Sequence, residues 1–113
     1  MAHEQRDISD GTLAVRTSTE GHTCTVALRG ELDLANATTA ETAIGEALGD
    51  ESRQVLVDLS ELEFIDSTGI ALLVSALTHN GDGARLRFVP SRSPAVTRVL
   101  ELTGLADRLP FVE

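Results

Sequence analysis

The sequence contains no lysine, tryptophan or tyrosine, and it has one cysteine. The absence of lysine excludes a P-loop, whose lysine contacts bound phosphates, and it excludes Schiff-base chemistry. A single cysteine excludes an internal disulfide. No apolar run approaches the roughly 20 residues of a membrane-spanning helix. The polar residues 1–10 offer no apolar segment for a secretory signal, so we expect a cytoplasmic location.

Positive charge is also scarce. Eighteen acidic residues face nine arginines, which gives a formal net charge of −9, and aromatic residues make up 3% of the chain. Without a basic stripe or interleaved aromatics, the sequence argues against direct nucleic-acid binding. An acidic surface is typical of soluble proteins in general, and it also suits a basic protein partner.

The length of 113 residues corresponds to one domain with a substantial core. We expect residues 1–11 to form a flexible tail and residues 12–113 to form the single domain. Residues 12–17 and 23–29 alternate between apolar and polar side chains, with a short turn between them. This period of two predicts a β-hairpin with one buried face.

The remainder alternates helices with strands. Residues 37–48 carry an apolar stripe that predicts a helix, with Asp33 or Asn36 as its N-cap and Gly49 as its stop. Residues 85–89 predict a strand, and a helix begins near Pro94 and stops at Gly104. Residues 109–112 predict a short strand or a packed tail. The predicted order is β-β-α-β-α-β-α, an α/β fold with a mixed sheet.

The central unit runs from residue 55 to residue 80. A nearly continuous apolar run, Val55, Leu56, Val57 and Leu59, predicts a buried strand. Residues 66–69, which we call the elbow, combine turn and capping residues with two hydroxyl groups at a helix N-terminus. The helix that follows has one predicted buried face and ends at Asn80 and Gly81. Its predicted buried residues are Ile70, Leu73, Val74 and Leu77.

No catalytic apparatus is visible. The histidines fall in the predicted tail, in a turn and at a helix end, where solvated side chains are expected; they are His3, His22 and His79. Twelve residues of the same helix would separate His79 from Ser67 by about 18 Å. His79 therefore cannot act as a base for Ser67 within the chain. Cys24 falls on the apolar side of its strand and reads as a core residue. We therefore predict that the protein is not an enzyme.

Carboxylates near the predicted strand ends leave one alternative open. Asp33, Asp58 and Asp66 could gather and bind a cation. They do not have the spacing of a known ligand set, so the sequence predicts neither a metal nor another cofactor.

Three segments carry a resemblance to a known family. FIDSTG (residues 64–69) resembles the signature of STAS domains, and GELDLANA (residues 30–37) resembles a second element of that family. ELTGLADRLPF (residues 101–111) resembles its usual ending. The likeness covers about residues 11–113, and bacterial anti-sigma factor antagonists are the branch that this sequence most resembles.

This resemblance implies a fold and a function. The family fold is a small mixed sheet with helices packed chiefly on one face. Its members bind an anti-sigma factor that is also a serine kinase of the GHKL ATPase type, and this binding frees the sigma factor. The kinase phosphorylates the hydroxyl after the motif aspartate, here Ser67, and a PPM-type phosphatase restores the free hydroxyl. Asp33 matches a position that the family uses against the kinase.

We therefore predict phosphorylation at Ser67 and a partner-binding surface around the elbow. The residues predicted for that surface are Glu31, Asp33, Asp66, Ser67, Thr68, Gly69 and Ile70. Purely structural roles are the alternative. Ser67 or Thr68 would cap the helix, with Thr68 expected to do so, Gly69 would allow close packing, and Asp66 would close the turn.

A second function also fits the resemblance. Some STAS domains are subunits of membrane transporters, including lipid-transport ABC complexes, or scaffolds of stress-signalling complexes. In those proteins the elbow is a docking surface that need not be phosphorylated.

Overall fold

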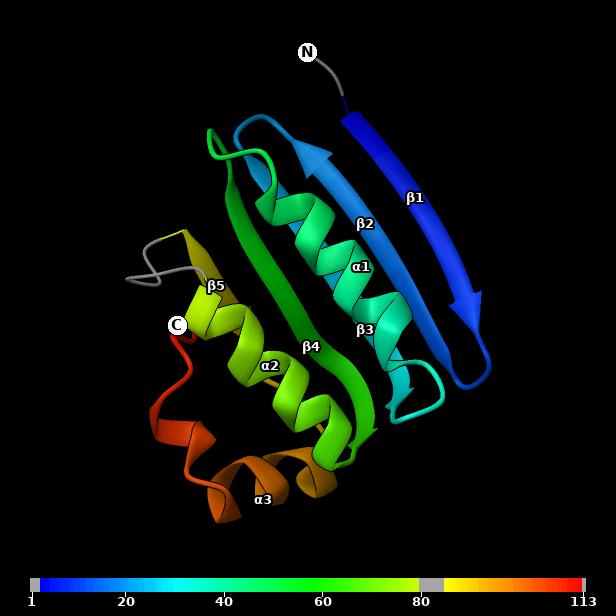
Figure 1. The fold of residues 1–113 in the computed structure, drawn as a ribbon, viewed down its shortest axis with the longest axis vertical. Helices are drawn as coiled ribbons and strands as arrows, with labels where there is room; N and C mark the ends of the chain where they lie inside the picture. Colours follow the sequence, from blue (N-terminus) through cyan, green and yellow to red (C-terminus); the bar gives the residue numbers. More distant parts are fainter. Residues whose placement is uncertain (1–2, 80–84, 113) are drawn as a thin grey trace.

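The structure is a computed structural model that describes residues 3–79 and 85–112, and the predicted stop at Asn80 and Gly81 lies outside these residues. Within them, one sheet has the strand order β1-β2-β3-β4-β5 (Figure 1). Strands β1 to β3 pair antiparallel, and β3, β4 and β5 pair parallel. The strands are β1 (His3–Asp10), β2 (Leu13–Glu20), β3 (Thr23–Leu32), β4 (Gln54–Ile65) and β5 (Leu86–Val89).

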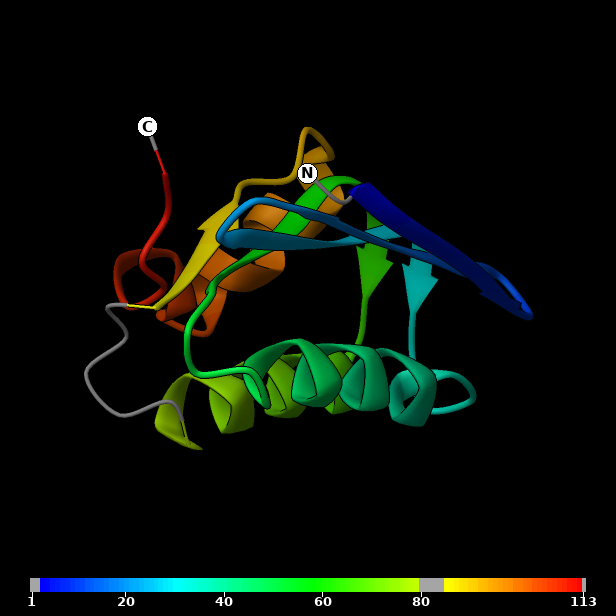
Figure 2. The same ribbon diagram turned by 90° about the horizontal axis from the view of Figure 1, so that it is seen from above.

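Three α-helices accompany the sheet: α1 (Ala37–Leu48), α2 (Ser67–His79) and α3 (Pro94–Leu102). Helices α1 and α2 lie side by side in one layer against one face, whereas α3 lies outside that layer (Figure 2). The predicted mixed sheet with helices chiefly on one face is therefore confirmed.

The core forms where the alternating and helical patterns predicted it. The inward residues of the hairpin are buried, as are Leu86 and Phe88 of β5. Strand β4 buries Val55, Val57 and Leu59, and it continues to Ile65, well past the apolar run that revealed it. Helix α2 buries Leu72 in addition to the predicted Leu73, while Ile70, Val74 and Leu77 are partly buried against the core.

The expectation of a flexible N-terminal tail is wrong for residues 3–10, which form the edge strand β1. This strand pairs with β2 along its whole length, from His3 opposite Glu20 to Asp10 opposite Leu13. Residues 4–9 are exposed, so no buried face marks the strand in the sequence. Main-chain hydrogen bonds hold it in place, and the Asp10 carboxylate also accepts a 2.6 Å hydrogen bond from the Thr39 hydroxyl of α1. The observed order is β-β-β-α-β-α-β-α.

The C-terminal segment packs against β5. Helix α3 starts at the predicted Pro94, and Gly104 follows its end with a positive φ of 79°. A short 3₁₀ helix, η1 (Leu105–Asp107), comes next. Phe111 then makes one parallel bridge to Phe88, and the two rings meet edge to face at 6.3 Å. Of the two predicted alternatives, the packed tail is the better description.

Candidate functional site

The elbow connects β4 to α2, and Asp66 caps the helix. Its Oδ1 accepts hydrogen bonds from the backbone N–H groups of Thr68 at 2.9 Å and Gly69 at 3.0 Å. Its carbonyl oxygen accepts the N–H of Ile70 at 2.9 Å. These are the contacts of an N-cap residue, which satisfies helix N–H groups that have no partner within the helix. The prediction that Thr68 caps α2 is therefore wrong, because the carboxylate before the helix already occupies that position.

The two hydroxyl residues lie in the first turn of α2. Ser67 is exposed and Thr68 is partly buried. Within residues 3–79 and 85–112, the Ser67 hydroxyl has no hydrogen-bond partner. A negatively charged group on Ser67 would lie at the positive end of the helix dipole, but also next to the carboxylate of Asp66.

Gly69 has a packing role. It is buried, and a Cβ atom at this position would lie 2.6 Å from Cγ1 of Ile65 and 2.9 Å from Cγ of Leu32. Any larger side chain would push α2 away from the ends of β3 and β4. The close-packing interpretation explains Gly69, and its burial keeps it from forming part of a contact surface.

The loop of residues 33–36 between β3 and α1 forms the second half of the site. Asn36 is 2% exposed. Its Oδ1 accepts the N–H of Asp33 at 3.0 Å, and its Nδ2 donates to the carbonyl of Glu31 at 3.0 Å. Oδ1 of Asp33 accepts the N–H of Ala35 at 3.0 Å. Asn36 stands at the N-cap position of α1 but makes no side-chain cap bond, so both predicted caps serve the loop instead.

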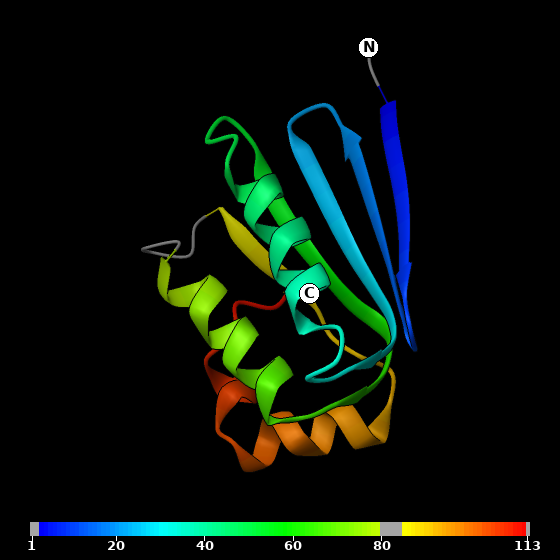
Figure 3. The ribbon, with the colours of Figure 1, turned by 45° about the vertical axis from the view of Figure 1, so that its right-hand side comes forward.

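The loop and the elbow meet at one end of the sheet (Figure 3). Oδ2 of Asp66 accepts the backbone N–H of Leu34 at 3.2 Å. Leu34 is 76% exposed at this junction. This exposure could not be predicted from the sequence, because Leu34 lies three residues before Ala37 and fits the spacing of the buried α1 stripe.

The alternative of a cation site made by Asp33, Asp58 and Asp66 finds no support in the described part of the chain. Within the described residues, no group of three or more histidine, cysteine, aspartate or glutamate side chains is arranged to hold a metal ion. The carboxylate of Asp58 instead accepts the N–H of Ser60, two residues away, at 2.8 Å.

His79 Nδ1 lies 2.8 Å from the carbonyl oxygen of Ser75 on its own helix. None of the helices in the described part of the chain is both long and apolar enough to cross a membrane.

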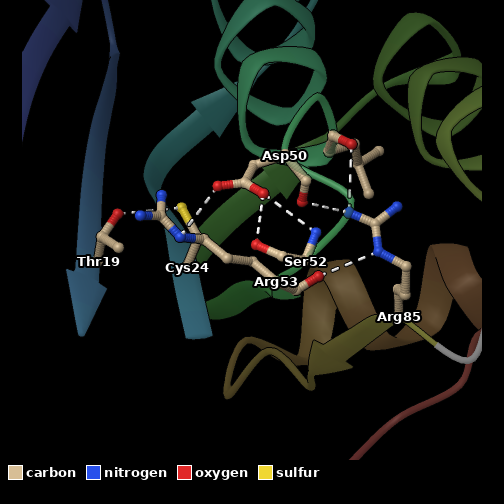
Figure 4. A network of polar contacts seen from close by, with 7 residues as sticks. Thr19, Cys24, Asp50, Ser52, Arg53 and Arg85 are labelled. Atoms are coloured by element: carbon tan, nitrogen blue, oxygen red, sulfur yellow. Dashed lines mark hydrogen bonds and ion pairs between the residues drawn. The ribbon is translucent and has the colours of Figure 1, made fainter. Parts of the chain in front are cut away.

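A polar network lies at the opposite end of α1 (Figure 4). The guanidinium of Arg85 donates to the carbonyls of Arg53 at 3.0 Å, Leu48 at 3.2 Å and Asp50 at 2.8 Å. Hydrogen bonds from the hydroxyl and the backbone N–H of Ser52 lower the pKa of the exposed Asp50 carboxyl, with Arg53 as a weaker contributor. This network holds the connection between α1 and β4 and, among the residues that the structure describes, makes no hydrogen bond to the elbow.

The family model described as "Mlab, STAS domain" matches residues 15–113. The chain belongs to the STAS domain family. This match begins within β2 and includes both the loop of residues 33–36 and the elbow.

Individual relatives agree with that assignment. The chain is 32% identical over 95 residues to the anti-sigma-F factor antagonist RsfB of Mycobacterium tuberculosis, covering 83% of this chain and 76% of the relative. It is 28% identical to an anti-sigma-B factor antagonist of Staphylococcus aureus, covering 84% and 88%. The crystal structure of an anti-sigma factor antagonist from Mycobacterium paratuberculosis superposes with a TM-score of 0.80 at 28% identity, covering 91% and 87%.

Proposed function

We propose that this STAS protein is a cytoplasmic anti-sigma factor antagonist. Its unphosphorylated form binds an anti-sigma factor serine kinase of the GHKL ATPase type and thereby releases the sigma factor. It acts by binding and is not itself an enzyme. Similarity to antagonists that span most of this chain supports the proposal.

The observation that carries the proposal is the exposed Ser67 at the start of α2, directly after the residue that caps this helix. Ser67 is the proposed phosphate acceptor. Its hydroxyl is accessible to a kinase, whereas Thr68 is partly buried. A PPM-type phosphatase would return the protein to its binding form.

The proposed contact surface consists of the elbow, the adjacent loop and the flank of α2. Glu31, Asp33 and Asp66 supply negative charge there, so the partner should present arginine or lysine. Ser67, Thr68 and Ile70 are exposed or partly exposed at the helix start. Gly69 supports this surface from inside by letting the helix pack closely.

The acceptor is tested by incubating the protein with ATP and each purified GHKL-type anti-sigma kinase of the host, followed by mass spectrometry. We expect one phosphate on Ser67. Ser67→Ala should abolish the modification, and Thr68→Val should keep it. A phosphate mapped to Thr68, or a modified Ser67→Ala protein, would contradict the assignment.

The acidic surface is tested by calorimetry with the same kinase. Asp33→Arg should weaken binding while the melting temperature stays close to that of the wild type. Asp107→Arg, on an exposed residue of η1, is the control and should bind normally. Equal affinity of Asp33→Arg and wild type would count against a role for this acidic turn.

A further inference from the structure

Leu34 stands out among the exposed apolar side chains. In the described residues, four large apolar side chains are exposed: Ile8 at 44%, Leu34 at 76%, Phe64 at 44% and Leu102 at 72%. A single exposed leucine is ordinary on a protein surface. Leu34 differs because it is the most exposed of the four and lies where the loop and the elbow are hydrogen-bonded together.

The backbone around Leu34 is fixed on both sides. Its own N–H donates to Asp66, and the N–H of Ala35 donates to Asp33. The buried Asn36 side chain binds the Asp33 N–H and the Glu31 carbonyl. An apolar side chain on such a held loop loses little conformational entropy when a partner covers it.

The surroundings of Leu34 give its partner a definite chemistry. Carboxylates of Asp33 and Asp66 flank its backbone, and Ser67 follows Asp66 directly in the chain. We propose that Leu34 is an apolar anchor of the partner interface, and that the anti-sigma partner holds an apolar pocket with a basic rim. This inference rests on the proposed function, and it names a contact that charge complementarity alone does not provide.

Asp66 is the positioning residue in this arrangement. One of its oxygens caps α2 and the other holds the N–H of Leu34, so the anchor and the phosphate acceptor keep a fixed relation. An asparagine at this position could still cap the helix through its Oδ1. Its amide NH₂ would then face the N–H of Leu34, and two donors cannot bond to each other.

The anchor is tested with the kinase that modifies Ser67, using calorimetry on unphosphorylated proteins. Burying a leucine side chain is worth enough that Leu34→Ala should weaken binding by about tenfold to a hundredfold. Leu102→Ala is the matched control, because this leucine is almost equally exposed at the end of α3. Its affinity should equal that of the wild type, and neither change should alter the melting temperature noticeably.

The outcomes separate the two claims. If wild-type protein binds none of the kinases, the proposed function fails and the anchor fails with it. If the wild type binds and Leu34→Ala binds equally well, only the anchor is overturned. Equal weakening by Leu34→Ala and Leu102→Ala would also overturn it, because the effect would not be specific to the elbow.

The positioning role has a readout that needs no partner. In Asp66→Asn, amide hydrogen exchange at Leu34 should accelerate at least several-fold, while the amides of Thr68 and Gly69 stay protected. Binding to the kinase should fall as the loop is released. Unchanged exchange at Leu34, or loss of protection at the start of α2 alone, would overturn the role of Asp66 in holding the anchor.

Discussion

Leu34 and Asp66 are separated by 32 residues in the sequence and are joined by one hydrogen bond of 3.2 Å. The same carboxylate that accepts this bond also accepts the first free N–H groups of α2. One side chain therefore connects the end of β3 to the start of α2. A change at Asp66 affects both the helix start and the loop, which makes it the most informative position for mutation.

Asp66→Ala should lower the free energy of unfolding. Loss of an N-cap side chain typically costs about 0.5–2 kcal/mol. The N–H of Leu34 lies at an exposed position, so it can bond to water in the variant and adds little to that cost. Urea denaturation followed by circular dichroism measures the effect. Glu41→Ala, on an exposed residue of α1, is the control and should change stability by less than about 0.5 kcal/mol. Equal stability of Asp66→Ala and wild type would contradict the assignment of Asp66 as the cap.

Gly69→Ala and Gly45→Ala should change stability in opposite directions. At Gly69 the added methyl group would meet Ile65 and Leu32 below 3.0 Å, and overpacking of this kind costs about 1–3 kcal/mol. At Gly45, inside α1, nothing lies within 4 Å of the added atom, so alanine should stabilise by about 0.5–1 kcal/mol. Thermal and urea unfolding of both variants test this. An unchanged or increased stability of Gly69→Ala would show that α2 does not pack as closely as described, and a destabilised Gly45→Ala would contradict the open space at that position.

The Asp50 carboxyl should titrate below its ordinary value of 3.8, because Ser52 donates two hydrogen bonds to its charged form. A lowered pKa in the folded state means that the contribution to stability is present above the ordinary value. That contribution is lost as the pH falls through the folded-state pKa. In Ser52→Ala the pKa should rise, and carboxyl NMR titration measures it. Ser75→Ala should leave the titration unchanged, and an unshifted pKa in Ser52→Ala would refute the cause given.

Phosphorylation of Ser67 should block binding with little effect on the fold. A negative charge at a helix N-terminus stabilises the folded protein by roughly 0.3–1 kcal/mol. Repulsion between the phosphate and the Asp66 carboxylate opposes this stabilisation. At the interface the phosphate must be desolvated among carboxylates, which costs several kcal/mol and weakens binding by orders of magnitude. Melting temperature, amide spectra and kinase affinity of both forms test this. Changes in amide chemical shifts throughout the core, or a change in melting temperature above about 8 °C, would indicate a conformational switch instead.

Much of this fold could be predicted because strands and helices with one buried face carry apolar residues at regular spacing. The hairpin, the α1 stripe and the apolar run of β4 put most of their predicted residues in the core, and Leu48 and Leu56 are partly buried. Strand β1 could not be found this way, because residues 4–9 have no buried face and are held by backbone pairing. The second half of β4 was hidden for a related reason: Glu61, Glu63 and Phe64 are exposed and break the apolar pattern.

The sequence predicted where the candidate site lies in the chain, but not which hydrogen bonds its residues make. The motif placed Ser67 at a helix start, and the structure agrees. Which oxygen caps the helix depends on geometry one residue upstream, so Asp66 and not Thr68 makes those bonds. The hydrogen bond between Leu34 and Asp66 joins residues that are 32 positions apart, so no local sequence pattern predicts it. The exposure of Leu34 was equally hidden, since its spacing imitates a buried helix position.

The order of the strands in the sheet is the same as their order in the chain. Each strand can therefore pair with the strand made just before it, which keeps the closing loops short during folding. During synthesis from the N-terminus, β1, β2 and β3 can form a meander before β4 adds to it. Both the loop of residues 33–36 and the elbow are then already present when β5 emerges. The contact between Asp66 and Leu34 can thus form while the last quarter of the chain is still being translated.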